Sequence, residues 1–143
     1  MLYIRPSMKS SDIPSSQTLR RRLDPHYLSQ KERLKYELKT AASKLSLTMD
    51  CWTSKNQHSF LGITVHYIDS SWTIRSSLLD FVPVNGPHTG ENLAACLFSV
   101  LEDFKISEKI VAITTDNASN NDTMLASLGD LLLAKGIVFI AQY

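Results

Sequence analysis

The first 44 residues follow a helical pattern of apolar positions after a polar lead-in. Residues 1–17 are rich in Ser and Pro and are expected to be extended. Pro25 is expected to separate a short helix that ends at Leu23 from a longer helix over 27–44. In the longer helix the apolar residues recur at helical spacing, so one face is expected to lean on the rest of the domain. These residues are Leu34, Leu38, Ala41 and Leu45.

The pattern then changes to the alternation that is typical of strands. Apolar and polar residues alternate over 45–49 and again over 60–68, and each stretch predicts a strand. A third strand is predicted over 72–82, and the short turn at 69–71 joins it to the second strand as an antiparallel hairpin. The apolar residues that mark these strands are Leu45, Leu47, Met49, Leu61, Ile63, Val65, Tyr67, Trp72, Ile74 and Leu78.

The second half of the chain alternates between helical and strand patterns. A loop over 83–88 precedes Thr89, which is expected to cap a helix. The unbroken run over 110–115 predicts a strand buried on both faces. A second helix is expected to end at Gly136, and a last buried strand is expected over 137–141. The apolar faces of the two helices are Leu93, Leu97, Leu101 and Phe104 for the first, and Met124, Leu125, Leu128, Leu131 and Leu132 for the second.

This order of elements predicts an α/β fold with a mixed sheet. Three antiparallel strands are followed by helix, strand, helix and strand, and right-handed crossovers place the fourth strand parallel to the first if the two pair. A Rossmann-like sheet with another strand between these two stays open as an alternative. We expect a basic helical lead-in over 1–44 and a sheet domain over 45–143, and the end of the chain directly after the last predicted strand suggests truncation.

Composition and charge narrow the classes of protein. A length of 143 residues with 43% hydrophobic residues fits one domain with its own core. No apolar run is long enough to predict a membrane span, and the first residues do not have the pattern of a signal peptide. The net charge of +1 divides unevenly, since residues 1–45 carry ten Lys/Arg against four Asp/Glu and residues 46–143 carry five against ten. The basic segment is either a surface for a polyanion or a solvated amphipathic helix.

Two aspartates end the first and the fourth predicted strands. Asp50 follows the strand over 45–49, and Asp116 follows the strand over 110–115. If these strands are parallel neighbours, about 4.8 Å apart, both carboxylates emerge at one edge of the sheet. Two such carboxylates repel each other unless a cation lies between them, and oxygen ligands suit Mg²⁺ or Mn²⁺. The alternative is that each Asp simply begins a turn.

Polar and aromatic neighbours of the two aspartates are further candidates for this site. Trp52 follows the first aspartate and is expected either to stack on a base or, as is more common at a strand end, to pack in the core. Thr53 and Ser54 after the first aspartate, and Asn117 and Asn120 after the second, are expected to support the site or to form ordinary turns. The two cysteines, Cys51 and Cys96, have no metal spacing, so structural zinc is not expected and the compartment is expected to be reducing. No histidine partner can be assigned to Cys51, and His58 and His88 are expected to be solvated in loops.

Five ordered segments of the chain resemble the hAT superfamily of transposases, close to its BED-zinc-finger and ricesleeper-like branch. The stretch over 47–54 resembles the Asp-x-Trp-Thr-Ser motif of that superfamily. The other segments are the lead-in over 13–24, the strand over 59–69, the stretches over 78–81 and 88–92, and the second acidic motif over 114–121. The resemblance covers nearly the whole chain.

The resemblance implies an RNase H-like catalytic core that cleaves and joins DNA with two divalent metal ions. Asp50 and Asp116 match the first two members of an Asp-Asp-Glu triad. The third member lies far downstream in the family, and none of Glu91, Glu102 and Glu108 stands at its place. The expectation is therefore a transposase fragment that is not catalytically competent alone and binds metal weakly.

The family also implies DNA as the partner, a nuclear location, and homo-oligomers formed through regions that this chain lacks. The alternative is a domesticated, non-catalytic DNA-associated or protein-interaction module that keeps only the fold. These two hypotheses predict the same sheet and differ in whether Asp50 and Asp116 bind metal.

Overall fold

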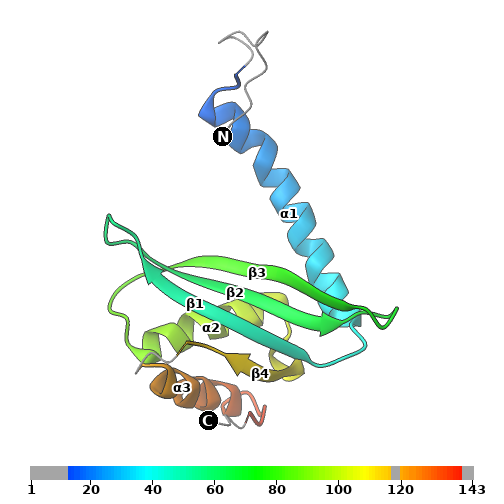
Figure 1. The fold of residues 1–143 in the computed structure, drawn as a ribbon, viewed down its shortest axis with the longest axis vertical. Coiled ribbons are helices and arrows are strands. Elements are labelled where there is room, and N and C mark those ends of the chain that lie inside the picture. Colours follow the sequence, from blue (N-terminus) through cyan, green and yellow to red (C-terminus); the bar gives the residue numbers. More distant parts are fainter. Residues whose placement is uncertain (1–12, 117–119, 140–143) are drawn as a thin grey trace. The chain divides into compact units, whose positions relative to one another are not determined.

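The computed structural model describes residues 13–116 and 120–139, and the chain divides into two compact units, residues 1–34 and 35–143 (Figure 1). The elements in chain order are α1 (Ser16–Thr40), β1 (Leu45–Thr53), β2 (Ser59–Ile68), β3 (Ile74–Val84), α2 (Gly90–Phe104), η2 (Ser107–Lys109), β4 (Ile110–Thr114) and α3 (Asn121–Leu133). Among the described residues, no helix combines the length and the apolar character needed to cross a membrane.

Helix α1 is continuous through Pro25, so the predicted break between two helices is wrong. Ser15 begins it, because its hydroxyl accepts a hydrogen bond from the backbone N–H of Thr18 at 3.2 Å. An interior proline costs a helix about 3 kcal/mol, whereas the Arg and Leu residues on both sides of Pro25, and the Lys and Glu residues after it, favour the helix. In the second unit, Leu38 is fully buried, which agrees with the predicted apolar face.

The four strands form one mixed sheet in the order β3-β2-β1-β4, as the element pattern predicted. β1 and β4 are parallel, whereas β1 pairs with β2 and β2 with β3 in antiparallel fashion. Because β1 and β4 are direct neighbours, the Rossmann-like alternative with an intervening strand is excluded. This mixed sheet with helices agrees with the RNase H-like fold that the family resemblance implies.

One face of the sheet is packed against α2, and α3 packs against α2 (Figure 1). The alternating residues of the first two strands point to this face, as predicted. The predicted apolar face of α2 is buried, and that of α3 is buried except for Leu125 and Leu131, which are half-buried. The buried side chains are Leu45, Leu47, Met49, Leu61, Ile63, Val65, Tyr67, Leu93, Leu97, Leu101, Phe104, Met124, Leu128 and Leu132. Thr89 caps α2 as predicted, since its hydroxyl accepts from the N–H of Asn92 at 3.3 Å.

Strand β3 departs from the prediction because its pairing with β2 contains a bulge. Ile63 pairs with Asp80 and the next residue of β2 pairs with Leu78, so Leu79 is the extra residue. Leu79 therefore turns toward the core and is buried, while Leu78 is 62% exposed on the other face. Trp72 lies in the turn before β3 rather than in the strand, with φ 59°.

Three strand boundaries differ from the sequence prediction. β1 does not end before Asp50 but continues to Thr53, because β2 pairs with it up to that residue. β3 continues through Pro83, which an edge strand tolerates, so the predicted loop begins later. Residues 137–139 form no strand and Val138 is 76% exposed, contrary to the predicted burial, whereas 140–141 lie outside the described residues.

Strand β4 was predicted to be buried on both faces, and this prediction is wrong. Val111 is 59% exposed, and the neighbouring Ala112 is exposed as well. In the sheet that the structure describes, β4 is an edge strand with β1 on one side. An apolar run alone therefore does not distinguish a central strand from an edge strand.

Candidate metal centre

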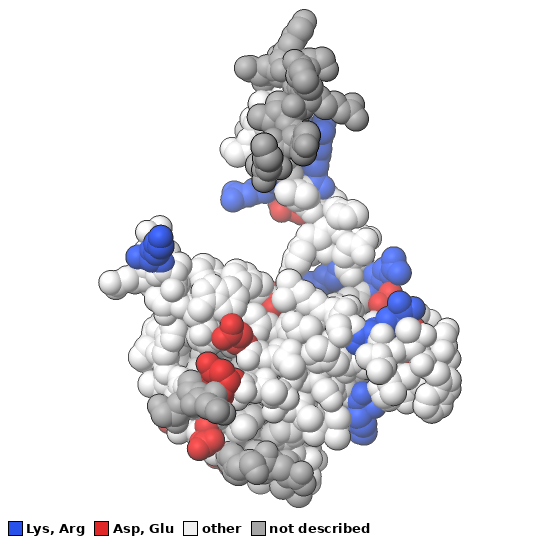
Figure 2. All heavy atoms as spheres, viewed as in Figure 1, with Lys and Arg blue, Asp and Glu red and all other residues white. Residues whose placement is uncertain are grey.

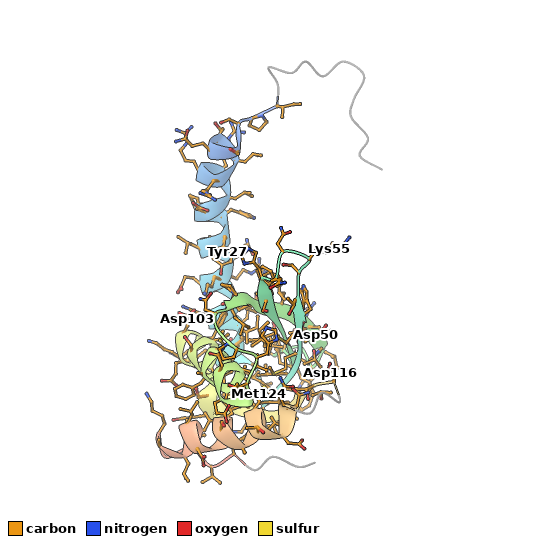
Figure 3. All side chains as sticks on the ribbon, turned by 90° about the vertical axis from the view of Figure 1, so that its left-hand side faces the viewer. Tyr27, Asp50, Lys55, Asp103, Asp116 and Met124 are labelled. Atoms are coloured by element: carbon orange, nitrogen blue, oxygen red, sulfur yellow. The ribbon has the colours of Figure 1, made fainter. Side chains whose placement is uncertain are left out.

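The two aspartates singled out by the sequence lie side by side at one rim of the sheet (Figure 3). Thr48 of β1 pairs with Thr114 of β4 in parallel register, so Asp50 and Asp116 each follow that pair by the same number of residues. Both line one cavity of about 170 Å³. Acidic side chains also gather on the left of the face drawn in Figure 2, the side toward which β1 runs in Figure 1.

Asp50 points to the face of the sheet that α2 does not cover. Along β1, Leu47 and Met49 are buried, whereas Thr48 and Asp50 are exposed. Side chains alternate between the two faces of a strand, so Asp50 and Trp52 share the open face. Trp52 is 41% exposed there, which differs from the core packing that is common for an aromatic residue at a strand end.

Asp116 is held in place by the first residue of α3. The side-chain amide of Asn121 donates to the carboxylate oxygen Oδ1 of Asp116 at 2.9 Å and to its backbone carbonyl at 2.5 Å. Asn121 was not among the site residues predicted from the sequence. The signal available was the run of polar residues after β4, but which of them turns back to the carboxylate depends on the loop conformation.

The neighbouring Asn120 connects α3 to the loop before α2. Its side-chain amide donates to the backbone carbonyl of His88 at 3.0 Å. A Cβ atom added to Gly90 would lie 2.6 Å from the backbone nitrogen of Met124, so the first turns of α2 and α3 touch directly. This contact sets the position of the start of α3, where Asn121 binds Asp116.

The other predicted supporting residues have separate roles or are not described. The hydroxyl of Thr53 hydrogen-bonds that of Ser59 at 3.2 Å, and the hydroxyl of Ser54 accepts from the N–H of His58 at 3.1 Å. These bonds shape the hairpin between β1 and β2. Asn117 lies outside the described residues.

A cysteine and a histidine also line the cavity of the two aspartates. Cys51 Sγ lies 3.9 Å from His88 Nδ1, although the residues are 37 positions apart, so Cys51 has a histidine neighbour that the sequence did not assign. His88 is a loop residue as predicted, but it is half-buried rather than solvated. Burial first, and then the charge of Asp50, raise the pKa of the Cys51 thiol above its ordinary value. The thiol is therefore protonated near neutral pH and is a poor nucleophile.

The donor atoms at this rim fit a hard divalent cation. Two carboxylates that face one cavity supply oxygen ligands and negative charge, which Mg²⁺ and Mn²⁺ prefer. Within the described residues, no three His, Cys, Asp or Glu side chains are grouped as ligands of one metal ion. Asp50 and Asp116 would thus provide part of a coordination sphere, and water or further groups the rest.

Comparison with known proteins assigns the part of the chain that carries this rim to a family. The family model of the ZBED1 RNase-like domain matches residues 48–141, which include both aspartates. A protein of Talaromyces stipitatus named as a transcriptional regulator, tpeD, is 39% identical over 120 residues, covering 84% of this chain and 14% of that protein.

Two plant proteins show the same relationship. One from Zea mays named as an AC transposase is 36% identical, over 77% of this chain and 14% of its own length. The BED domain-containing zinc finger protein RICESLEEPER 2 from Oryza sativa subsp. japonica is 30% identical, over 81% of this chain and 17% of its own length. The chain thus spans a small part of these relatives, 14% to 17% of their lengths. It belongs to the family of the ZBED1 RNase-like domain and is related to the hAT-type transposases.

Proposed function

We propose that this chain carries the first two metal ligands of a hAT-type transposase core, and that DNA is the substrate of that core. The observation that carries the proposal is the position of Asp50 and Asp116 on adjacent parallel strands, at one level and in one cavity. A name of AC transposase for one relative supports the same class of activity. A protein that acts on chromosomal DNA works in the nucleus.

In this proposal each residue of the rim has a defined task. Asp50 and Asp116 bind Mg²⁺ or Mn²⁺, and Asn121 orients the carboxylate of Asp116. When bound, the ions supply positive charge at the oxygen that attacks the phosphate and at the oxygen that leaves it. Asn120 binds the start of α3 to His88 in the loop before α2, and Trp52 borders the site on the open face of the sheet.

We further propose that residues 1–143 do not cleave DNA by themselves. Affinity for hard cations grows with the number of charged ligands, so two carboxylates bind Mg²⁺ or Mn²⁺ weakly. The third acidic residue that the family resemblance implies has no counterpart at Glu91 or Glu102, which lie in α2. The expected result is measurable but weak metal binding without strand cleavage.

Calorimetric titration with Mn²⁺ tests the proposal directly. Asp50→Asn and Asp116→Asn should each weaken Mn²⁺ binding at least tenfold, because each removes one charged ligand. Asp130→Asn in α3 is the matched control, since it removes the same charge away from the rim. Equal binding by all four proteins, or no binding by the unaltered chain, contradicts a metal centre at this position.

The second candidate function is a non-catalytic DNA-associated module. It is favoured by the tpeD relative, which is named as a transcriptional regulator and is 39% identical to this chain. Such a module would bind DNA equally well in EDTA and in Mn²⁺, and Asp50→Asn would not alter that binding. Electrophoretic mobility shifts under both conditions distinguish the two candidates.

A further inference from the structure

The open face of the sheet carries a cluster of three aromatic rings next to Asp50. Trp52 of β1, Phe60 of β2 and Phe81 of β3 contact one another, with ring centroids 5.2 Å apart for Trp52 and Phe81 and 5.0 Å for Phe60 and Phe81. Trp52 is 41% exposed and Phe81 is 44% exposed. The cluster is therefore an accessible apolar surface and not part of the core.

Gly62 allows the indole ring to lie over β2 at the level of Asp50. A Cβ atom at Gly62 would lie 3.1 Å from Cζ3 and 3.3 Å from Cη2 of Trp52, so the six-membered ring covers the backbone of β2 there. Gly62 is the cross-strand partner of Asp50. The ring of Trp52 thus extends from its own position back to the side of Asp50.

A shallow cavity joins the ring of Trp52 to Asp50, the first of the two aspartates. This cavity of about 290 Å³ is lined by Asp50, Trp52, Gly62, Thr64, Leu78 and Phe81. Asp50 also lines the cavity that contains Asp116. The aromatic surface therefore borders the acidic rim at Asp50, which lines both cavities.

We propose that Trp52 and Phe81 form a stacking site for an unpaired base of the DNA strand whose phosphate is bound at Asp50 and Asp116. This inference rests on the proposed function. Two residues along a strand span about 6.6 Å, so the base of a nucleotide bound at the carboxylates comes within reach of the ring. Every base has an aromatic face, and stacking on Trp holds it without reading the sequence.

The negative net charge of the sheet domain makes DNA binding at this surface depend on divalent cations. Residues 46–143 carry ten Asp/Glu against five Lys/Arg, so the domain does not attract phosphates by itself. Divalent cations at the carboxylates have to offset that repulsion. Stacking on Trp52 is consequently coupled to metal binding at Asp50 and Asp116.

Tryptophan fluorescence of the full chain tests the proposal. The chain has two tryptophans, and replacing Trp72, which lies in a turn and is 82% exposed, leaves Trp52 as the single fluorescent tryptophan. In the Trp72→Phe variant, a short single-stranded oligonucleotide should quench Trp52 in Mn²⁺ and quench it much less in EDTA. The same oligonucleotide with abasic sites, and a blunt duplex, should quench weakly. Trp52→Leu should reduce affinity for the single strand about tenfold or more, while Trp72→Leu leaves it unchanged.

The outcomes separate this inference from the proposed function. If Mn²⁺ binds but neither quenching nor a Trp52→Leu effect is seen, the stacking site is wrong and the metal centre stands. If Mn²⁺ does not bind and quenching is also absent, both are wrong. Quenching that is equal in EDTA and in Mn²⁺ contradicts the coupling of stacking to metal binding. Concentration-dependent dimerisation that Trp52→Leu abolishes would show that the aromatic cluster binds a second copy of the chain instead of a base.

Discussion

At the scale of single residues, Asn121 is the group whose contribution to the acidic rim is best defined. Its amide donates to the carboxylate and to the backbone carbonyl of Asp116. Asn121→Ala should weaken Mn²⁺ binding several-fold because the carboxylate gains rotamers that do not face the metal. The free energy of unfolding should fall by about 1 kcal/mol or less, since the bonds are partly exposed to water.

The measurement for Asn121→Ala is a Mn²⁺ titration together with urea unfolding. Asn56→Ala, in the exposed hairpin turn, is the control and should alter neither quantity. Unchanged Mn²⁺ affinity in Asn121→Ala would show that Asp116 keeps its orientation by other contacts.

A second residue, Asp69, should make stability depend on acid. Its carboxylate accepts from the N–H groups of Ser71 at 2.9 Å and Thr73 at 3.0 Å, and from Arg75 Nε at 2.7 Å. The bond from the Thr73 backbone first, and then the one from Arg75, hold the pKa of Asp69 below its ordinary 3.8. A lowered pKa in the folded state stabilises the protein above the unfolded pKa, and this contribution is lost as pH falls through the folded value.

Asp69→Asn removes the titration and therefore that part of the acid dependence. The free energy of unfolding of the unaltered chain should fall more steeply below about pH 4 than that of Asp69→Asn. Urea unfolding at a series of pH values from neutral to acidic measures both slopes. Parallel curves over the whole series would exclude Asp69 as a source of acid sensitivity.

At the scale of elements, the junction of α2 and α3 tolerates only glycine at its centre. A Cβ at Gly90 would lie 2.6 Å from the backbone nitrogen of Met124 and 2.8 Å from the carbonyl oxygen of Asn120. Gly90→Ala should lower the free energy of unfolding by about 1–3 kcal/mol, as overpacking does. Because α3 has to move, Mn²⁺ binding should weaken as well.

Gly129→Ala in α3 is the matched control for this junction. The nearest atom to its added Cβ is 3.9 Å away, at the carbonyl oxygen of Phe139. Alanine is the better helix former, so this variant should be as stable as the unaltered chain or up to about 1 kcal/mol more stable. Thermal unfolding of the two variants compares them directly, and a stabilised Gly90→Ala would contradict the contact.

The same elements show which parts of the fold are readable from the sequence. The alternation over β1 and β2 is local, and it predicted the buried faces of both strands. The bulge at Leu79 was not predictable, because it depends on how β2 and β3 pair. The meeting of Asp50 and Asp116 followed from strand order and handedness, whereas the contact of His88 with Cys51 depends on loop conformation.

At the scale of the whole molecule, Lys109 connects the end of α1 to the sheet inside the second unit. Its ammonium donates to the carbonyl oxygens of Leu38 at 2.7 Å, Ala41 at 3.1 Å and Lys39 at 3.2 Å. These carbonyls belong to the last turn of α1 and the residue after it, where a positive charge is favourable. One side chain thus satisfies three acceptors that belong to a segment distant in sequence.

Lys109→Met keeps most of the side-chain volume and removes the donors, so it leaves those carbonyls unsatisfied. The free energy of unfolding should fall by about 1–2 kcal/mol, because the carbonyls of Leu38 and Ala41 are partly buried and lose their partner, whereas that of Lys39 is exposed to water. Lys55→Met, in the exposed hairpin turn, is the control and should stay within about 0.5 kcal/mol of the unaltered chain.

Hydrogen exchange of the α1 amides at residues 35–40 provides the local readout. Faster exchange there in Lys109→Met, with the β2 amides equally protected, would place the loss at the end of α1, whereas unchanged exchange and stability would show that water replaces the ammonium without cost.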